Sequence, residues 1–271
     1  MNRPESPGIP DVQSHADQRA LAIDRVGIRS LRYPIRFEDR GSGDSVDVQS
    51  TVATFGVYVA LPADRKGTHM SRLVAAIDEM HEPFSLAQLP EWVAALLRRL
   101  ESDAGSVDIE FPWFMRKTAP VSGVGSVMDY TVKLAARADA RSCEVTASIV
   151  IPVMSLCPSS KAIADYGAHN QRSHLSIDVR PRFGARLSLA ELVRIGEEEA
   201  SCELYGLLKR NDEKYVTERA YERPRFVEDL VRGIASRLQG DTRFAGFRVA
   251  AENFESIHNH SAYAEIARGA I

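Results

Sequence analysis

Cysteine is scarce in this sequence: the 271 residues include three, Cys143, Cys157 and Cys202. An odd and small number of cysteines does not make a disulfide framework, and no C-x-x-C pair occurs, which excludes a zinc ribbon. So sparse a set fits a protein of the reducing cytoplasm. The three thiols are therefore candidates for packing or for chemistry rather than for cross-linking.

The sequence also lacks long apolar runs and an excess of basic charge. No stretch approaches the roughly 18 apolar residues of a membrane-spanning helix. No basic segment followed by an apolar one opens the chain, so we expect no secretory signal. The formal net charge of −3 gives no general attraction to nucleic acid. Hydrophobic residues at 44% and charged residues at 26% are typical of a globular protein.

Apolar periodicity in the first half of the chain predicts the element order β-β-α-α-β-β. Thr68 is a candidate N-cap for the first helix, and Ser85 with Gln88 forms a capping box before the second. Residues 40–44 form a turn between the first two strands. In chain order, the six predicted elements span residues 23–37, 46–61, 70–80, 89–100, 107–118 and 126–138.

The second half repeats that order of elements without repeating the residues. Ser188 with Glu191 forms another capping box, and Pro224 suits the first turn of a helix. The predicted elements span residues 143–154, 175–179, 188–195, 224–238, 244–251 and a short segment after 260. We therefore divide the chain into a polar, mobile arm at 1–19, a first unit at 20–140 and a second unit at 141–271.

The segment at 155–173, between two predicted strands, holds the first candidate site. Cys157 precedes a proline, which favours extended geometry at a strand end, and His169 follows twelve residues later. A thiolate and an imidazole are good ligands for zinc and similar ions, and a catalytic site needs three protein ligands plus water. The alternative is a buried structural cysteine beside a loop histidine, and the spacing leaves both open.

A second cluster lies near the end of the chain, where Glu255, His258 and His260 stand within six residues. A strand would place the two histidines on one face, whereas a helix would bring Glu255 and His258 together. Either arrangement suits proton transfer near neutral pH. The alternative is an exposed polar tail.

Three further positions give weaker signals. Residues 207–217 read as a loop dense in charges of both signs, in which Glu213 can complete a Cys/His/carboxylate set or belong to a solvated helix entrance. Glu228 flanks the apolar stripe of its helix, where an exposed carboxylate is ordinary. His69 and Arg72 lie at a predicted helix N-terminus, which suits an anion; a simple cap with a solvated arginine is the alternative.

Taken together, these segments resemble the type IB GTP cyclohydrolase I family. One departure is local: Ser159 stands where relatives often have cysteine, and it leaves Cys157 untouched. The matching stretches follow the family order over nearly the whole chain after the arm, at residues 24–35, 67–72, 155–161, 167–172, 207–218, 226–229 and 254–263.

The resemblance implies an α+β architecture, the tunnelling fold, in which two tandem β-β-α-α-β-β units carry antiparallel sheets with helices on one face. It also implies a homotetramer with its sites between subunits, and one divalent metal ion per site, which can be zinc, manganese or iron. The implied metal ligands are Cys157, His169 and Glu213. The other implied site residues are Glu228 at the guanine edge and Glu255, His258 and His260 near the reacting carbon.

The implied reaction adds water at C8 of GTP, opens the imidazole ring and releases formate. Its product is 7,8-dihydroneopterin triphosphate, the first intermediate of folate and pterin biosynthesis. Cys157 takes part through the metal, and protonation of N7 suits His258 or His260. The triphosphate requires cations, for which the candidates are Arg72, beside His69, and Lys161, Lys209 and Arg210.

Three other functions remain compatible with these residues. A tunnelling-fold nitrile reductase would use Cys157 as a nucleophile, but the surrounding histidines and Glu213 favour a metal. An archaeal-type cyclohydrolase would stop at a cyclic phosphate product. A non-catalytic purine- or pterin-binding protein would have no use for so complete a set of catalytic side chains.

Overall fold

One antiparallel sheet runs through the whole computed structural model, which describes residues 13, 15–40, 46–80 and 82–271. Within this part of the chain the nine strands follow the order β1-β2-β3-β4-β5-β6-β8-β9, and the short β7 pairs with β5. The strands are β1 (Ile23–Arg40), β2 (Val46–Leu61), β3 (Gly105–Thr118), β4 (Gly125–Ala138), β5 (Cys143–Leu156), β6 (Asn170–Pro181), β7 (Cys202–Glu203), β8 (Phe244–Asn253) and β9 (Ala262–Gly269).

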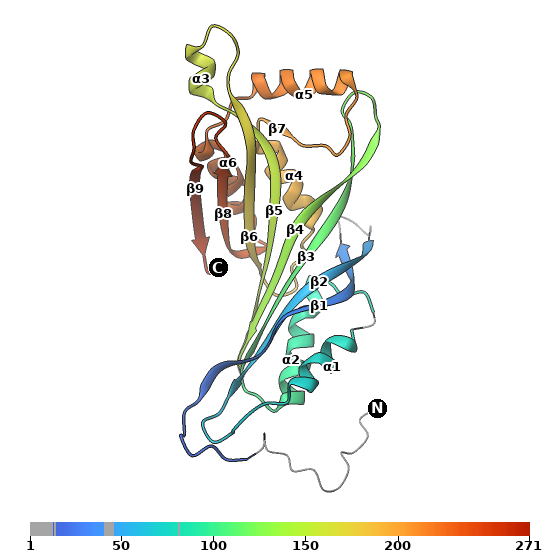
Figure 1. The fold of residues 1–271 in the computed structure, drawn as a ribbon, viewed down its shortest axis with the longest axis vertical. Helices are drawn as coiled ribbons and strands as arrows, with labels where there is room; N and C mark the ends of the chain where they lie inside the picture. Colours follow the sequence, from blue (N-terminus) through green and yellow to red (C-terminus); the bar gives the residue numbers. More distant parts are fainter. Residues whose placement is uncertain (1–12, 14, 41–45, 81) are drawn as a thin grey trace.

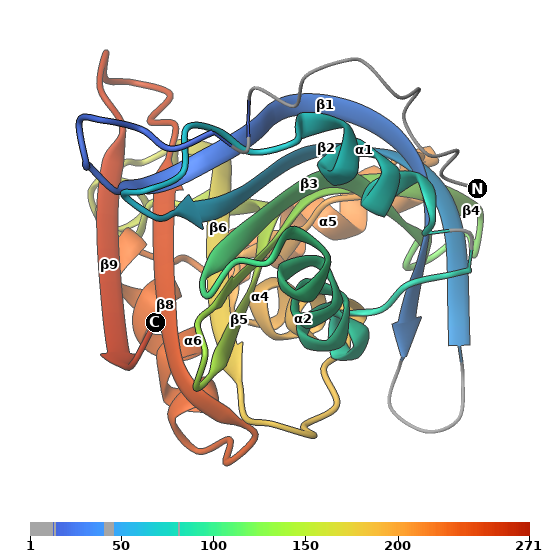
Figure 2. The same ribbon diagram turned by 90° about the horizontal axis from the view of Figure 1, so that it is seen from below.

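Helices interrupt the run of described strands at four places, after β2, β5, β6 and β7. Figure 1 shows α1 and α2 near one end of the long sheet and α3 and α5 near the other, and Figure 2 shows the sheet curving around α2, α4 and α6. No helix in the described part of the chain is long and apolar enough to cross a membrane. The helices are α1 (Met70–Asp78), the short 3-10 helix η2 (Leu86–Gln88), α2 (Leu89–Leu100), α3 (Pro158–Ile163), α4 (Leu189–Glu199), α5 (Arg210–Glu222) and α6 (Val227–Gln239).

The helix-covered face of the sheet forms one hydrophobic core that both halves of the chain share. Alternate strand residues such as Phe55, Ile109, Ile149 and Ile177 are completely or almost completely buried, as the period-2 pattern requires. The halves join because β4 and β5 pair from Thr131↔Val150 to Ala138↔Cys143. The helix residues that close this core include Leu73, Val93, Leu96, Leu192, Leu230 and Ile234.

Asp39, near the end of β1, ties the first half of the chain to the second. Its carboxylate accepts hydrogen bonds from the backbone N–H groups of Leu189 and Ala190, at 3.0 and 3.4 Å, and from the Ser188 hydroxyl at 3.3 Å. Ser188 is the N-cap of α4, as predicted, and accepts from the Glu191 N–H at 3.4 Å. The N–H groups at the start of α4, which have no partner within the helix, thus find acceptors in both halves of the chain: the carboxylate of Asp39 and the hydroxyl of Ser188.

The largest difference from the sequence prediction is α5, a full helix where the charge pattern indicated a loop. Its apolar stripe is too weak for periodicity to reveal, since only Asp212, Val216 and Ala220 are buried. The Asp212 carboxylate holds the start of the helix to the β3–β4 turn. It accepts from the backbone N–H groups of Val121, Ser122 and Lys209 at 2.8–2.9 Å.

Other boundaries shift by up to five residues, the largest shift being the start of β6, and α3 and β7 were not predicted. His69 rather than Thr68 is the N-cap of α1. Pro224 lies before α6 rather than in its first turn, because Phe226 is the N-cap and donates its N–H to Asp229 at 2.9 Å. The capping box of Ser85 and Gln88 is present as predicted.

Most of the predicted arm at 1–19 and most of the predicted turn at 40–44 lie outside the described residues. The part of the arm that is described follows the loop between β2 and α1. There the Gly67 N–H donates to the Gln13 carbonyl at 3.1 Å, and the Lys66 N–H donates to the His15 carbonyl at 3.0 Å. This part of the arm is therefore attached to the first half of the chain.

Candidate functional site

Cys157 and His169 are neighbours because they flank the same hairpin. β5 and β6 pair up to Leu156↔Asn170. The residue that follows β5 must therefore lie beside the residue that precedes β6, with α3 placed between them. The Cys157 N–H donates to the His169 carbonyl at 3.1 Å.

Ser160, in α3, fixes the two residues relative to each other. Its backbone N–H donates to the Cys157 sulfur at 3.4 Å, so that Cys157 caps α3. Its hydroxyl donates to the Cys157 carbonyl at 3.1 Å and accepts from the His169 N–H at 3.2 Å. A rigid backbone frame of this kind holds both side chains at the end of the hairpin.

Glu255 joins this pair from the next strand. Because β6 and β8 pair up to Ser173↔Asn253, the residues after β8 run beside the start of β6. A carboxylate oxygen of Glu255 lies 3.8 Å from His169 Nδ1, and the side chains are 13% and 12% exposed. Among the described contacts, Glu255 therefore meets His169 and not His258, its neighbour in the helical alternative.

A buried chain of polar side chains, which the sequence analysis missed, continues behind His169. The side-chain oxygen of Gln171 lies 3.0 Å from His169 Nδ1, and the amide nitrogen of Gln171 donates to the Ser155 hydroxyl at 2.9 Å. The hydroxyls of Ser155 and Ser173 are 2.7 Å apart. The signal in the sequence was that Gln171 and Ser173 are polar, although they occupy inward positions of β6 at which the alternating pattern predicts apolar residues.

His258 and His260 lie on the exposed loop between β8 and β9, in neither the strand nor the helix that the sequence analysis considered. Their rings stack on each other, with centroids 5.1 Å apart and planes 15° from parallel. Both rings face solvent rather than the core, which leaves them accessible to a small molecule.

Glu213 and Glu228 are exposed and lie in the first turns of α5 and α6. The described residues contain no group of three or more His, Cys, Asp or Glu side chains placed to hold a metal ion. One chain therefore does not bring Glu213 together with Cys157 and His169, and this predicted ligand set stays a prediction.

The predicted phosphate-binding cations have different surroundings. Lys161 donates to the Tyr221 carbonyl, and its ammonium lies 4.3 Å from the centre of the Tyr221 ring, so it packs α3 against the end of α5. Lys209 and Arg210 are exposed at the start of α5. Lys209 and Arg210 are therefore more accessible to a phosphate than Lys161 is.

His69 and Arg72 lie far from the other predicted residues. They line a pocket of about 300 Å³ at the start of α1, together with Arg65, Glu101 and other residues. Figure 1 shows α1 and α3 at opposite ends of the molecule. A single chain thus does not bring His69 and Arg72 to Cys157 and His169, which flank α3.

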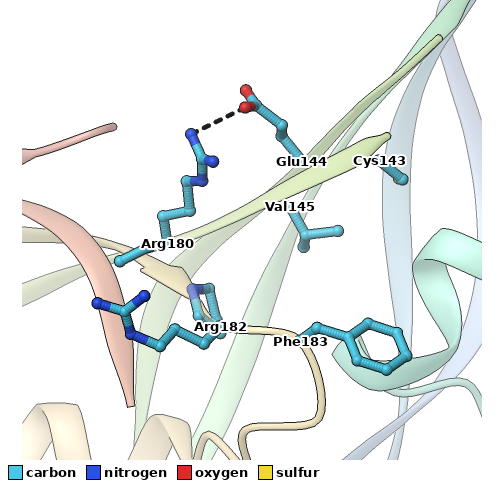
Figure 3. A pocket seen from close by; sticks show the side chains of 8 residues that line it. Cys143, Glu144, Val145, Arg180, Arg182 and Phe183 are labelled. Atoms are coloured by element: carbon cyan, nitrogen blue, oxygen red, sulfur yellow. Dashed lines mark ion pairs between the residues drawn. The ribbon is translucent and has the colours of Figure 1, made fainter. Parts of the chain in front are cut away.

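A second pocket, of about 400 Å³, contains none of the predicted residues. Figure 3 shows its lining, which includes the ion pair of Arg180 with Glu144 at 2.9 Å and the exposed ring of Phe183. It lies where β5 begins, whereas Cys157 follows the end of that strand. This pocket is not part of the candidate site.

The fold defines a class of proteins before any residue is compared. A crystal structure of urate oxidase from Bacillus sp. TB-90 matches with a TM-score of 0.52 at 10% identity, covering 92% of this chain and 100% of that one. The urate oxidase of Bacillus subtilis 168 matches with a TM-score of 0.51 at 8% identity, covering 90% and 98%. This chain is a tunnelling-fold protein, as predicted.

Sequence comparison then supplies the family. The model of "Type I GTP cyclohydrolase folE2" matches residues 9–264. "GTP cyclohydrolase FolE2 1" of Dechloromonas aromatica (strain RCB) is 53% identical over 98% of both chains. "GTP cyclohydrolase FolE2" of Ralstonia nicotianae (strain ATCC BAA-1114 / GMI1000) is 54% identical over 96% of this chain and 94% of that one. The chain belongs to the type I GTP cyclohydrolase FolE2 family, which confirms the resemblance seen in the sequence.

Proposed function

We propose that this protein is a metal-dependent GTP cyclohydrolase. It hydrolyses GTP at C8, opens the imidazole ring, releases formate and yields 7,8-dihydroneopterin triphosphate, the first step of folate biosynthesis. The observation that carries this proposal is the cluster of Cys157, His169 and Glu255, three chemically active side chains at adjoining strand ends. It occurs in a chain that matches its family over nearly the full length.

The donor set at this cluster fits a divalent metal ion. Cys157 offers sulfur and His169 offers nitrogen from one rigid hairpin end, and sulfur, nitrogen and carboxylate donors together suit zinc, manganese or iron. Cys157 and His169 would hold the ion, with Glu213 as the third ligand. When bound, such an ion makes hydroxide available at neutral pH by lowering the pKa of water from about 15.7 toward about 7.

The other predicted residues would bind and orient the purine. The exposed carboxylate of Glu228 can accept two hydrogen bonds, from guanine N1–H and from the exocyclic amine. Adenine presents an acceptor at N1 and would leave that carboxylate unpaired, so it would be rejected. The accessible rings of His258 and His260 suit proton transfer to N7, while Arg72, Lys209 and Arg210 are candidates for the triphosphate.

The assembly that we propose is a cytoplasmic homotetramer with its sites between subunits. In the described sheet, β1 and β9 pair with a neighbouring strand on one side only. Phe84 bonds to the outer edge of β1 at residues 36–38, so β9 and the rest of β1 are the edges open to another chain. A second copy would also bring His69 and Arg72 of one subunit toward Cys157 and His169 of another. The three free cysteines suit a reducing compartment.

The test compares metal content with formate release from GTP in the wild type and in two cysteine variants. Cys157→Ala is expected to lose metal and turnover while it keeps the fold. Cys143→Ala is the matched control, because Cys143 is a free thiol at the other end of β5. The proposal fails if the wild type releases no formate with any of the three metals, or if Cys157→Ala retains both metal and rate. Reduction of a nitrile by metal-free wild type, with a reduced nicotinamide cofactor as the hydride donor, would favour the nucleophilic-cysteine alternative.

A further inference from the structure

We propose that Gln171 is a positioning residue that holds His169 in its Nδ1–H tautomer and so leaves the lone pair on Nε2. The expected effect of Gln171 on metal affinity rests on the proposed function, because that effect requires His169 to be a metal ligand. The tautomer itself follows from the contacts around the ring.

The contacts at Nδ1 decide where the proton resides. A neutral imidazole has one N–H and one lone pair, and the hydrogen bond at one nitrogen sets the role of the other. The oxygen of the Gln171 amide lies 3.0 Å from Nδ1 and can only accept. A carboxylate oxygen of Glu255 lies 3.8 Å from the same nitrogen, where it attracts an N–H and repels a lone pair.

Buried partners also hold the Gln171 amide in place. Its nitrogen donates to the Ser155 hydroxyl at 2.9 Å, and that hydroxyl lies 2.7 Å from the hydroxyl of Ser173. Gln171 is 7% exposed, and both serines are completely buried. A buried amide with no water to replace its partners does not rotate freely. The carboxylate of Glu255 favours an N–H at Nδ1, and this N–H in turn favours the orientation in which the amide oxygen faces His169.

The backbone completes the arrangement. The His169 N–H and carbonyl are both engaged, by Ser160 and Cys157, so that the ring can turn only about its side-chain bonds. With Nδ1 bonded to Gln171, these bonds are fixed as well. Nε2 is then the nitrogen that remains for a metal ion.

The first measurement is the tautomer of His169 in the metal-free, full-length protein. Histidine labelled with ¹⁵N in the ring gives two-bond and three-bond proton correlations that distinguish the tautomers, and a spectrum at about pH 9 reports neutral rings. His169→Gln identifies the signal among the seven histidines. We expect the Nδ1–H form in the wild type.

Two substitutions at Gln171 separate its oxygen from its bulk. Gln171→Met keeps the length of the side chain but removes the acceptor, and it is expected to populate the Nε2–H form. Gln171→Glu keeps an acceptor opposite Nδ1 and is expected to retain the Nδ1–H form. Gln239→Met makes the same exchange at an exposed position at the end of α6 and is the matched control.

Metal affinity is the second readout, measured by competition with a chromophoric zinc chelator. Loss of the outer hydrogen-bond partner of a metal ligand weakens metal binding about 10- to 100-fold, and we expect this for Gln171→Met. Gln171→Glu should bind zinc no more weakly than the wild type. If Gln171→Met does not fold, Ser155→Ala frees the far end of the same amide and should shift the tautomer in the same direction.

Three results would overturn the inference. They are an Nε2–H tautomer in the wild type, an unchanged tautomer in Gln171→Met, and a changed tautomer with unchanged zinc affinity in Gln171→Met although His169→Gln loses zinc. A failure of the proposed function looks different: His169→Gln would bind zinc as tightly as the wild type, whereas the spectra would still decide the role of Gln171.

Discussion

Replacing Asp39 by alanine is expected to destabilise the protein by about 1–2 kcal/mol, because this carboxylate caps a helix that lies in the other half of the chain. Asp39 is 5% exposed and accepts from Leu189, Ala190 and Ser188 at 3.0–3.4 Å. Alanine would leave the Leu189 N–H without its acceptor in a place that water barely reaches. Ser188 remains as an N-cap in the variant, which keeps the expected loss from being larger.

Asparagine should be tolerated much better than alanine at this position. Burial raises the pKa of the Asp39 carboxyl, although hydrogen bonds from Leu189, Ala190 and Ser188 partly offset the effect. The negative charge is therefore not what stabilises the fold; the acceptor oxygen is. Asp39→Asn keeps one such oxygen, and we expect it to cost less than about 1 kcal/mol.

The raised pKa also fixes the direction of the pH dependence. In the folded state Asp39 holds its proton more tightly than in the unfolded chain. The stability that this difference in pKa adds to the folded state is therefore fully present below the ordinary pKa of 3.8. It declines as the pH rises through the pKa of Asp39 in the folded state. The stability of the wild type relative to Asp39→Asn should therefore fall as the pH rises from 3.5 toward neutrality.

The assay is denaturant-induced unfolding at one fixed protein concentration, since an oligomer gains stability with concentration. Asp24→Ala, an exposed substitution on the same strand, is the matched control and should change little. Hydrogen exchange at the first turn of α4 locates the effect. The reasoning is refuted if Asp39→Ala unfolds at the same denaturant concentration as Asp24→Ala, or if asparagine is as damaging as alanine.

Three further predictions concern the site and the pH range of stability. Glu228→Gln should lower kcat/KM for GTP by the equivalent of about 1.5–3 kcal/mol with metal content unchanged; metal loss would instead place Glu228 among the ligands. Alanine at the more important of His258 and His260 should lower kcat about 10²- to 10⁴-fold and leave zinc bound, whereas wild-type rates in both variants would make them bystanders. Burial raises the pKa of Glu203, but a hydrogen bond from Tyr205 and nearby positive charge outweigh it, so the pKa lies below the ordinary 4.5. Unfolding at graded pH should therefore show wild-type stability falling below pH 4.5 more steeply than that of Glu203→Gln, and parallel curves would contradict this.

The strands and most helices could be predicted because their signals are local. Residues such as Phe55 and Ile149 recur at every second position, and that period alone specifies one buried face. Ser85 with Gln88, and Ser188, marked helix starts through hydrogen bonds that span three residues. Signals of this range are complete within a short stretch of sequence.

The helix α5 could not be predicted in the same way, because its stability depends on a distant segment. Its residues are mostly charged and exposed, and its start is held by hydrogen bonds from Val121 and Ser122 to Asp212, about 90 positions away in the chain. The pattern of residues within 207–217 does not reveal these distant hydrogen bonds. Whether the segment is a loop or a helix was therefore decided by contacts with the turn between β3 and β4.

The sequence by itself determined the fold class and the family, because these depend on local periodicity and on short motifs, and it predicted the residue types of the candidate site. Only the tertiary structure decided which side chains meet. Sheet register placed Glu255 beside His169, whereas the loop between β8 and β9 stacked His258 on His260 instead. Because Gln171 points inward from β6, its side chain lies against the ring of His169. His69 and Arg72, at the start of α1, are separated from Gln171 and His169 by the length of the sheet. The physical reason is that contacts between strands follow from pairing across the sheet, which spacing along the chain does not specify.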